Sequence, residues 1–204
     1  MAILMTGLCE KGVELIWKQC NEELYPQGIE YLEEAAHAGD AEGWFFLGNC
    51  YSWGDGAVGF SDKKAYECYK KGIEGGSVRC VLGAARAGQF DEELKKASPC
   101  TLEESYRAVL QSAEEGDAFS AFQIAAAYEW ETIFDLLQPE EQKRENCYKW
   151  YEQAAKGGIV SAMVKVGKCC LNGQYVPKNE EMALKWADRC ACLLYTSDAA
   201  DDGE

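Results

Sequence analysis

A repeated type of helix ending constrains this chain more than any other feature, because it recurs at a nearly constant step. Glycines follow similar Ala-, Glu- and Lys-rich segments about 40 residues apart, at Gly39, Gly75, Gly116 and Gly157. A second series lies just beyond each glycine, at Leu47-Gly48, Leu82-Gly83, Ile124-Ala125 and Val166-Gly167. Two markers with one step predict a chain of stacked repeats.

Each unit has the pattern of a helical hairpin. In the clearest unit, a helix expected over residues 41–54 places Trp44, Leu47 and Tyr51 on one face. A Gly-rich loop follows, after which Asp62 is expected to cap a second helix. One hairpin cannot bury its apolar faces alone, so neighbouring hairpins must supply the rest of the core.

Two segments carry a more specific pattern. In residues 41–77 the matching positions are Leu47, Gly48, Tyr51, Gly54, Gly56, Asp62, Lys64, Ala65 and Tyr69. In residues 160–191 they are Val166, Gly167, Gly173, Val176, Asn179, Ala183 and Trp186. This pattern resembles the Sel1-like repeat, a relative of the tetratricopeptide (TPR) repeat with a longer loop and a longer period. The resemblance implies an all-α fold, a right-handed α-solenoid of stacked antiparallel helix pairs.

The other units diverge from this pattern. The expected organisation is a degenerate hairpin at 1–40, Sel1-like repeats at 41–77 and 160–191, and divergent repeats at 78–117 and 118–159. Within the first hairpin, helices are expected at 13–20 and 26–38. The divergent repeats contain insertions at 89–105 and 131–146, whose helical patterning predicts extended or additional helices.

The last residues, 192–204, do not continue the repeat. Residues 192–202 read CLLYTSDAADD, which resembles the in-frame translation of a transposon-end sequencing adaptor. We therefore expect a non-native tail here, with the native reading frame followed only to about Ala191.

Composition narrows the classes of partner. The formal net charge of −15 argues against nucleic acid and anionic membranes, which need a positively charged face. No stretch approaches the ~20 apolar residues of a membrane span, and no targeting segment is recognisable, so a cytoplasmic location is expected. The eleven cysteines have irregular spacings, and most are expected to be reduced, buried apolar side chains.

No catalytic, cofactor or metal site is predicted, and the chain is not expected to be an enzyme. Residues 54–59 match G-x-G-x-x-G but follow a helix, whereas a dinucleotide site needs a strand there. His37, the single histidine, is expected at a helix end on the surface. Cys169-Cys170 with Cys190 and Cys192 lack the spacing of a zinc site.

The leading hypothesis is a protein-interaction scaffold or adaptor that binds a protein or peptide. In TPR-related solenoids the first helices line a concave groove. The exposed positions expected there are Phe45, Asn49, Ser52, Phe122, Glu129 and Lys168. Trp53 and Trp130, near loop rims, are further recognition candidates. The alternative is a regulatory or recruiting repeat region of a larger protein with a catalytic domain elsewhere; the partner and the oligomeric state stay open.

Overall fold

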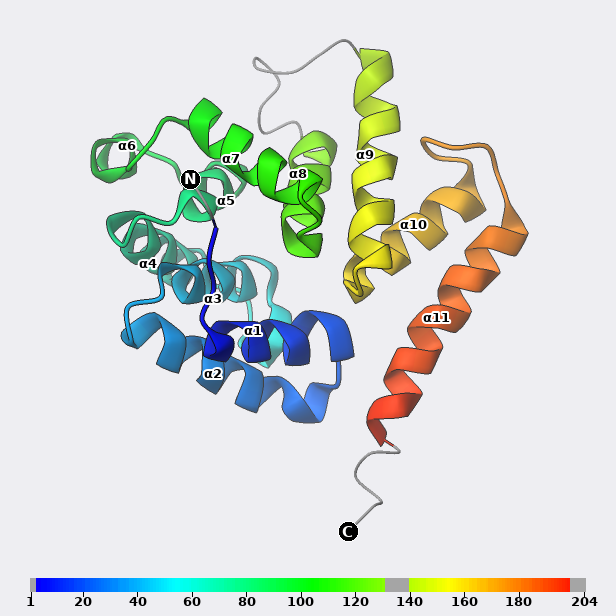
Figure 1. Cartoon of the computed structure of the whole chain (residues 1–204), viewed down its shortest axis with the longest axis horizontal. Coiled ribbons are helices and arrows are strands. Elements are labelled where there is room, and N and C mark those ends of the chain that lie inside the picture. Colours follow the sequence, from blue (N-terminus) through cyan, green and yellow to red (C-terminus); the bar gives the residue numbers. More distant parts are fainter. Residues whose placement is uncertain (1–2, 131–139, 199–204) are drawn as a thin grey trace. The chain divides into compact units, whose positions relative to one another are not determined.

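The computed structural model describes residues 3–130 and 140–198. Helices joined by short loops make up these residues, and none of them forms a β-strand, which confirms the all-α prediction (Figure 1). The chain divides into two compact units. The first comprises residues 1–16 and 21–109, and the second comprises residues 17–20 and 110–204.

Antiparallel helix pairs build the first unit (Figure 1). Its helices are α1 (Gly7–Val13), α2 (Tyr25–His37), α3 (Ala41–Trp53), α4 (Asp62–Glu74), α5 (Val78–Arg86) and α6 (Glu92–Ala97). Helix α1 pairs with α2, and α3 pairs with α4. Helix α2 also packs on α3, while α5 packs on both α3 and α4. Each hairpin therefore buries its apolar faces against the next one, as a stacked repeat requires.

The second unit continues the same construction. Helix α7 (Leu102–Glu114) crosses the boundary between the units, and α8 (Ala118–Glu129), α9 (Glu140–Lys156), α10 (Val160–Asn172) and α11 (Glu180–Asp198) follow. Helix α8 pairs with α9, α10 packs on α9, and α10 pairs with α11. The stacked antiparallel pairs predicted from the resemblance are thus present in both units.

Side-chain caps decide where several helices begin. Asp40 accepts a hydrogen bond from the Glu42 N–H at the start of α3, at 3.0 Å. At the start of α4, the Ser61 hydroxyl accepts from the Lys64 N–H, at 3.4 Å. The cap of α4 is therefore Ser61, and the prediction of Asp62 was wrong by one residue. Both side chains satisfy backbone donors that lack a partner within the helix.

The first hairpin begins earlier than the apolar pattern predicts. Thr6 caps α1, so that this helix starts at Gly7 and ends at Val13. The segment expected as the first helix, residues 13–20, instead contains a π-helical stretch at Glu14–Gln19. The second helix of the hairpin, α2, agrees with the expectation to within a residue at each end.

The insertions are helical where the structure describes them. Helix α6 lies within 89–105, which confirms an additional helix there. In the second insertion, α9 begins at Glu140, and the part before it lies outside the described residues. Helix α11 continues to Asp198, and the prediction that residues 192–204 are non-native stays a prediction.

Small residues let the helices of one pair approach closely. A Cβ atom added at Gly48 in α3 would lie 2.6 Å from Tyr69 Cε1 in α4. Real Cβ atoms do not approach other atoms so closely, so the Tyr69 ring occupies the space that only glycine leaves. Tyr69 itself is fully buried. The leucine–glycine marker of the repeat thus corresponds to an aromatic ring packed on a bare helix backbone.

Candidate partner-binding surfaces

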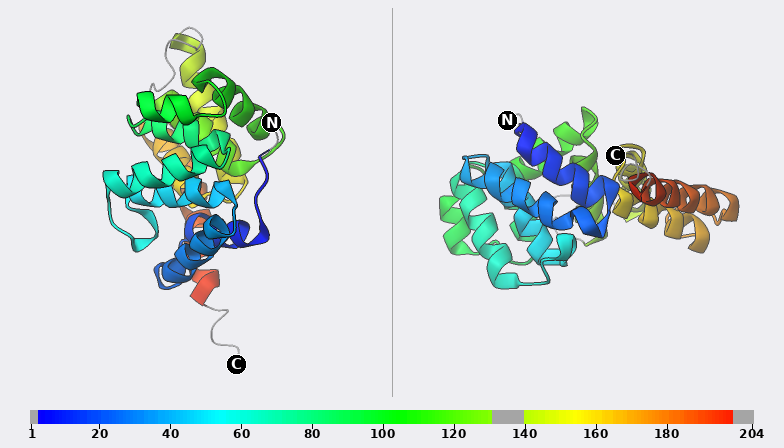
Figure 2. Two further views of the ribbon diagram at one scale, coloured as in Figure 1. Left: turned by 90° about the vertical axis from the view of Figure 1, so that its left-hand side faces the viewer. Right: turned by 90° about the horizontal axis from the view of Figure 1, so that it is seen from below.

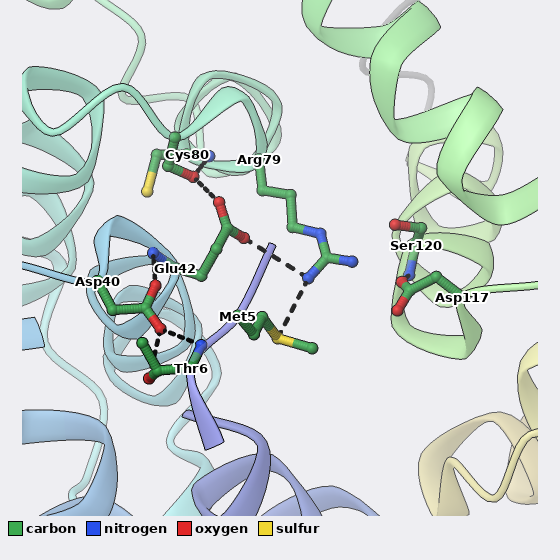
Figure 3. Close-up of polar contacts among 9 residues, drawn as sticks. Met5, Thr6, Asp40, Glu42, Arg79, Cys80, Asp117 and Ser120 are labelled. Carbon is green, nitrogen blue, oxygen red and sulfur yellow. Dashed lines mark hydrogen bonds and ion pairs between the residues drawn. The ribbon is translucent and has the colours of Figure 1, made fainter. Parts of the chain in front are cut away.

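A buried polar cluster joins the start of the chain to two repeats of the first unit (Figure 3). Asp40, at the start of α3, accepts hydrogen bonds from both the N–H and the hydroxyl of Thr6, each at 2.7 Å. The Ser77 hydroxyl donates to Glu42 at 2.7 Å and also caps α5. Two helix caps therefore share one network, which fixes α3 and α5 relative to each other.

Arg79 is the largest charged side chain in this cluster. It is fully buried, and its Nη1 lies 3.5 Å from Glu42 Oε2 and 3.8 Å from Met5 Sδ (Figure 3). The rings of Phe45 and Phe46 lie 5.8 Å from its guanidinium carbon. Buried charges need such partners because desolvation is costly. Arg79 is therefore a core residue and is not available to a partner.

The junction between α3–α4 and α5 contains a shared acceptor. Asn49 Oδ1, in α3, accepts from the Tyr69 hydroxyl of α4 at 3.1 Å and from Arg86 of α5 at 2.7 Å. Burial raises the pKa of Tyr69 to about 12, so its hydroxyl stays protonated and donates. One amide oxygen therefore links three helices of the first unit.

The junction between α8–α9 and α10 has a comparable arrangement in the second unit. Glu129, at the end of α8, accepts from the Tyr151 hydroxyl of α9 at 2.5 Å. Lys165 of α10 lies 2.8 Å from the same carboxylate. In both units a tyrosine of the second helix and a basic side chain of the following helix converge on one acceptor. We call this arrangement the junction latch.

In two repeats, an exposed tryptophan lies at the end of the first helix of the hairpin. Trp53 is the last residue of α3 and is 40% exposed, and Trp130 directly follows α8 and is 61% exposed. When the repeats are aligned on Leu47 and Ile124, these tryptophans occupy the same position. The Arg86 guanidinium lies 4.4 Å from the Trp53 ring centroid, a cation–π contact that orients this indole.

An apolar groove of about 600 Å³ lies between α10 and α11. Its walls include Val164 and Leu171 from α10 and Leu184 from α11, and all three side chains are exposed. Lys168 and Glu180 supply charged groups at the same groove. Lys168 makes no ion pair within the described part of the chain.

The six predicted partner-binding residues fall into two groups. Phe45, Asn49 and Phe122 are buried, so the expectation that they are exposed was wrong. Helix α3 packs against α2, α4 and α5, and Phe122 of α8 contacts Tyr151 of α9. Ser52 and Glu129 are partly exposed, and Lys168 is exposed. Whether these residues contact a partner stays a prediction.

The six residues are divided between the two compact units. Phe45, Asn49 and Ser52 belong to the first unit, whereas Phe122, Glu129 and Lys168 belong to the second. Sequence reasoning also missed the groove beside Lys168. The signal was present, since Leu184 occupies the position of Tyr66 and is followed by the small residues Ala187 and Ala191 on the same face.

The remaining residues considered as candidate sites are His37, the glycine-rich segment and the cysteines. His37 ends α2, is exposed, and contacts Glu33 O at 2.7 Å and the Trp44 ring, as expected of a helix-end histidine. The Gly54–Gly59 segment lies in the loop between α3 and α4, which confirms the prediction that it follows a helix. Seven of the eleven cysteines are buried, which confirms their role as apolar side chains. In the described ranges no three His, Cys, Asp or Glu side chains gather as a metal site would require.

Among the helices of the described residues, none is long and apolar enough to cross a membrane. This finding concerns the residues 3–130 and 140–198 alone.

Two solved structures resemble the chain. A Sel1 repeat protein from Oxalobacter formigenes is 21% identical with a TM-score of 0.41, over 81% of this chain and 45% of that one. A protective antigen of uropathogenic Escherichia coli, displaying an SLR fold, is 20% identical with a TM-score of 0.28, over 85% of this chain and 44% of that one. The chain thus spans less than half the length of either. No curated protein matches it.

A family model decides the classification. The model described as Sel1 repeat matches residues 23–40, 42–77, 137–159 and 160–193, which together make up more than half of the chain. Two of these matches cover the hairpins α3–α4 and α10–α11, where the resemblance is most specific in sequence. The chain therefore belongs to the Sel1 repeat family.

Proposed function

We propose that the chain is a protein-interaction scaffold or adaptor that holds a segment of a partner protein on the concave face of its repeats, formed by the first helices. Repeats of this family are generally protein–protein interaction modules. The observation that carries the proposal is the recurrence of an exposed tryptophan, Trp53 or Trp130, at the same position of two repeats.

Tryptophan is suited to this role. Its large apolar ring gains free energy when a partner covers it, and its indole N–H can donate a hydrogen bond at the same time. Trp53 is held in place by Arg86, so little side-chain entropy is lost when it binds. Ser52 and Glu129, two of the predicted residues, directly precede the tryptophans and offer polar contacts beside them.

The overall charge favours a basic partner segment. At a formal net charge of −15, the chain attracts positively charged peptides and accelerates their encounter at low salt. We also propose a cytoplasmic location, because a compartment that keeps thiols reduced suits the buried cysteines.

The proposal predicts that partner capture depends on the two tryptophans. In affinity capture from the source cells with quantitative mass spectrometry, the double variant Trp53→Ala/Trp130→Ala should recover partners at least about tenfold less well than the unmodified chain. The matched control is Phe60→Ala, which removes an aromatic side chain that is 67% exposed but lies in the α3–α4 loop.

Phe60→Ala should keep the melting temperature of the unmodified chain, since this side chain is 67% exposed. The double variant should stay folded but melt at a lower temperature, because Trp53 loses its contact with Arg86. Equal recovery by the folded double variant and the control would remove the tryptophans from the binding surface.

A further inference from the structure

We propose that the groove between α10 and α11 binds an amphipathic helix of a partner protein, one that presents a large apolar side chain to Ala187 and an acidic side chain to Lys168. The inference rests on the proposed function, because it assigns a second surface, with a defined ligand, to the same interaction module. Figure 2 shows α10 and α11 side by side, and their packing agrees with this view.

The groove corresponds to a face that is already occupied elsewhere in the chain. Aligning Leu47 with Val166, and Ala65 with Ala183, matches the sequence of the α10–α11 pair to that of the α3–α4 pair. The equivalent face of α3–α4 is covered by α5, which packs on both helices. The occupant expected from this continuity is therefore an α-helix lying where α5 lies on the first pair.

The shape of the groove differs from that of the covered face. On α3–α4, the large rings of Phe45 and Tyr69 meet Gly83 of α5, at which an added Cβ would lie 3.0 Å from Tyr69. In the groove the equivalent positions carry Val164 and Ala187. The receiving surface has lost bulk, so an occupant must supply a large apolar side chain where α5 has glycine.

The groove also differs in hydrogen-bonding character, because a cationic donor replaces a neutral acceptor. At the first junction latch, Asn49 accepts a hydrogen bond from Arg86 of the incoming helix. The equivalent of Asn49 in the groove is Lys168, which is exposed and makes no ion pair in the described part of the chain. At the position of Glu129, the acceptor of the second latch, the groove has Leu171. An acidic side chain is therefore the complement where α5 carries arginine.

A defined probe tests both requirements. A synthetic peptide of residues 76–89, stapled on its outer face to keep it helical, carries Cys80→Ala, Gly83→Leu and Arg86→Glu. The leucine faces Val164 and Ala187, and the glutamate faces Lys168. The matched peptide carries Cys80→Ala alone and so keeps glycine and arginine at the two deciding positions. Binding to the full chain is followed by fluorescence anisotropy of the labelled peptides.

The designed peptide should bind at least about tenfold more tightly than the matched peptide. Lys168→Glu should weaken the designed peptide about tenfold and improve binding of the matched peptide, whose arginine then meets a carboxylate. Leu184→Asp should abolish binding, because it places a charge on the apolar wall. Lys156→Glu, which reverses a comparably exposed charge in α9 away from the groove, should leave binding unchanged.

Two outcomes would overturn the inference. Equal affinities of the two peptides, or indifference to Lys168→Glu, would show that the groove does not select this helix. Concentration-dependent sedimentation that Leu184→Asp removes would show that a second copy of the chain occupies the groove instead. Circular dichroism of the Leu184→Asp variant verifies its fold. Partner capture through Trp53 and Trp130 does not use these residues, so failure of the groove to bind the peptide is distinguishable from failure of the tryptophan surface.

Discussion

At the residue scale, the buried pair of Arg79 and Glu42 shows how a charged group serves as a core residue. The guanidinium lies near two phenylalanine rings and a methionine sulfur, and the carboxylate also accepts from the Ser77 hydroxyl. A buried charge that loses its partner keeps its desolvation cost without compensation. The pair therefore helps to fix how α5 is placed on α3, because other placements would separate two buried opposite charges.

Glu42→Ala should lower the free energy of unfolding by about 3–5 kcal/mol, because it leaves the Arg79 guanidinium without this carboxylate in the core. Urea denaturation followed by circular dichroism measures the change. The control is Lys185→Ala, which removes an exposed ion pair with Glu181 and should cost no more than about 1 kcal/mol. Equal losses in both variants would contradict the structural role of the buried pair.

The buried cysteines should resist alkylation. Burial raises the pKa of the Cys68 thiol to about 11 and that of Cys147 to about 12. The thiolate is the reacting form, so a raised pKa moves reactivity to higher pH. Iodoacetamide at pH 7.5 should modify the exposed Cys192 at least about tenfold faster than Cys147 in the native protein, and both readily in urea. Peptide mapping by mass spectrometry gives the rates; similar native rates would contradict the burial.

At the element scale, each hairpin depends on how closely its two helices approach. Gly48 and Tyr69 achieve this in α3–α4 through a ring packed on a bare backbone. The α10–α11 pair keeps the glycine, Gly167, but replaces the ring position by Ala187, and the space above Gly167 is less tight. The equivalent glycines Gly48 and Gly167 are therefore expected to contribute differently to the stability of their repeats.

A pair of equivalent substitutions tests this difference. Gly48→Ala should cost about 1–3 kcal/mol of stability, because the new methyl group would displace the Tyr69 ring. Gly167→Ala should be neutral or stabilise by up to about 1 kcal/mol, since its Cβ would lie 3.6 Å from Trp186 Cβ and alanine favours helix. Chemical denaturation of both variants measures the two values, and a reversed order would refute the packing account.

Much of the element structure could be predicted from sequence. The 3.6-residue pattern and the glycine markers located α3, α4 and α10 because each signal is local. The predicted start of the first hairpin was too late in the sequence. Thr6 caps the helix that begins at Gly7, and its contact with Asp40 of a distant helix could not be read from the local pattern. The partner surface was only partly predictable: Phe45, Asn49 and Phe122 are covered by neighbouring helices, and one helical face alone does not reveal what packs on the other.

At the scale of the whole molecule, stability is expected to be distributed over repeats that contact mainly their neighbours. The chain contains two compact units, each with its own stacked hairpins and its own junction latch. Local opening can therefore differ between the units, and a change in one hairpin should act most strongly on the elements next to it.

Hydrogen exchange followed by mass spectrometry checks this expectation. Gly48→Ala should lower protection in α3, α4 and α5, which share one packed junction, more than in α9 and α10 of the other unit. Gly167→Ala provides the comparison variant in the second unit. Uniform loss of protection across the chain would instead indicate a single cooperative unit.

The cationic Lys168, which stands where the first pair has the acceptor Asn49, has a consequence for how repeats stack. A stack of similar units offers a similar apolar face at every level, so equivalent faces could bind the same helix unless their side chains differ. Here the chain's own incoming helices carry Arg86 or Lys165, like charges to Lys168, and α5 brings a glycine where the groove needs bulk. The α10–α11 face is thereby chemically unlike the α3–α4 face, which disfavours binding of a helix like α5 there and favours a helix of another composition.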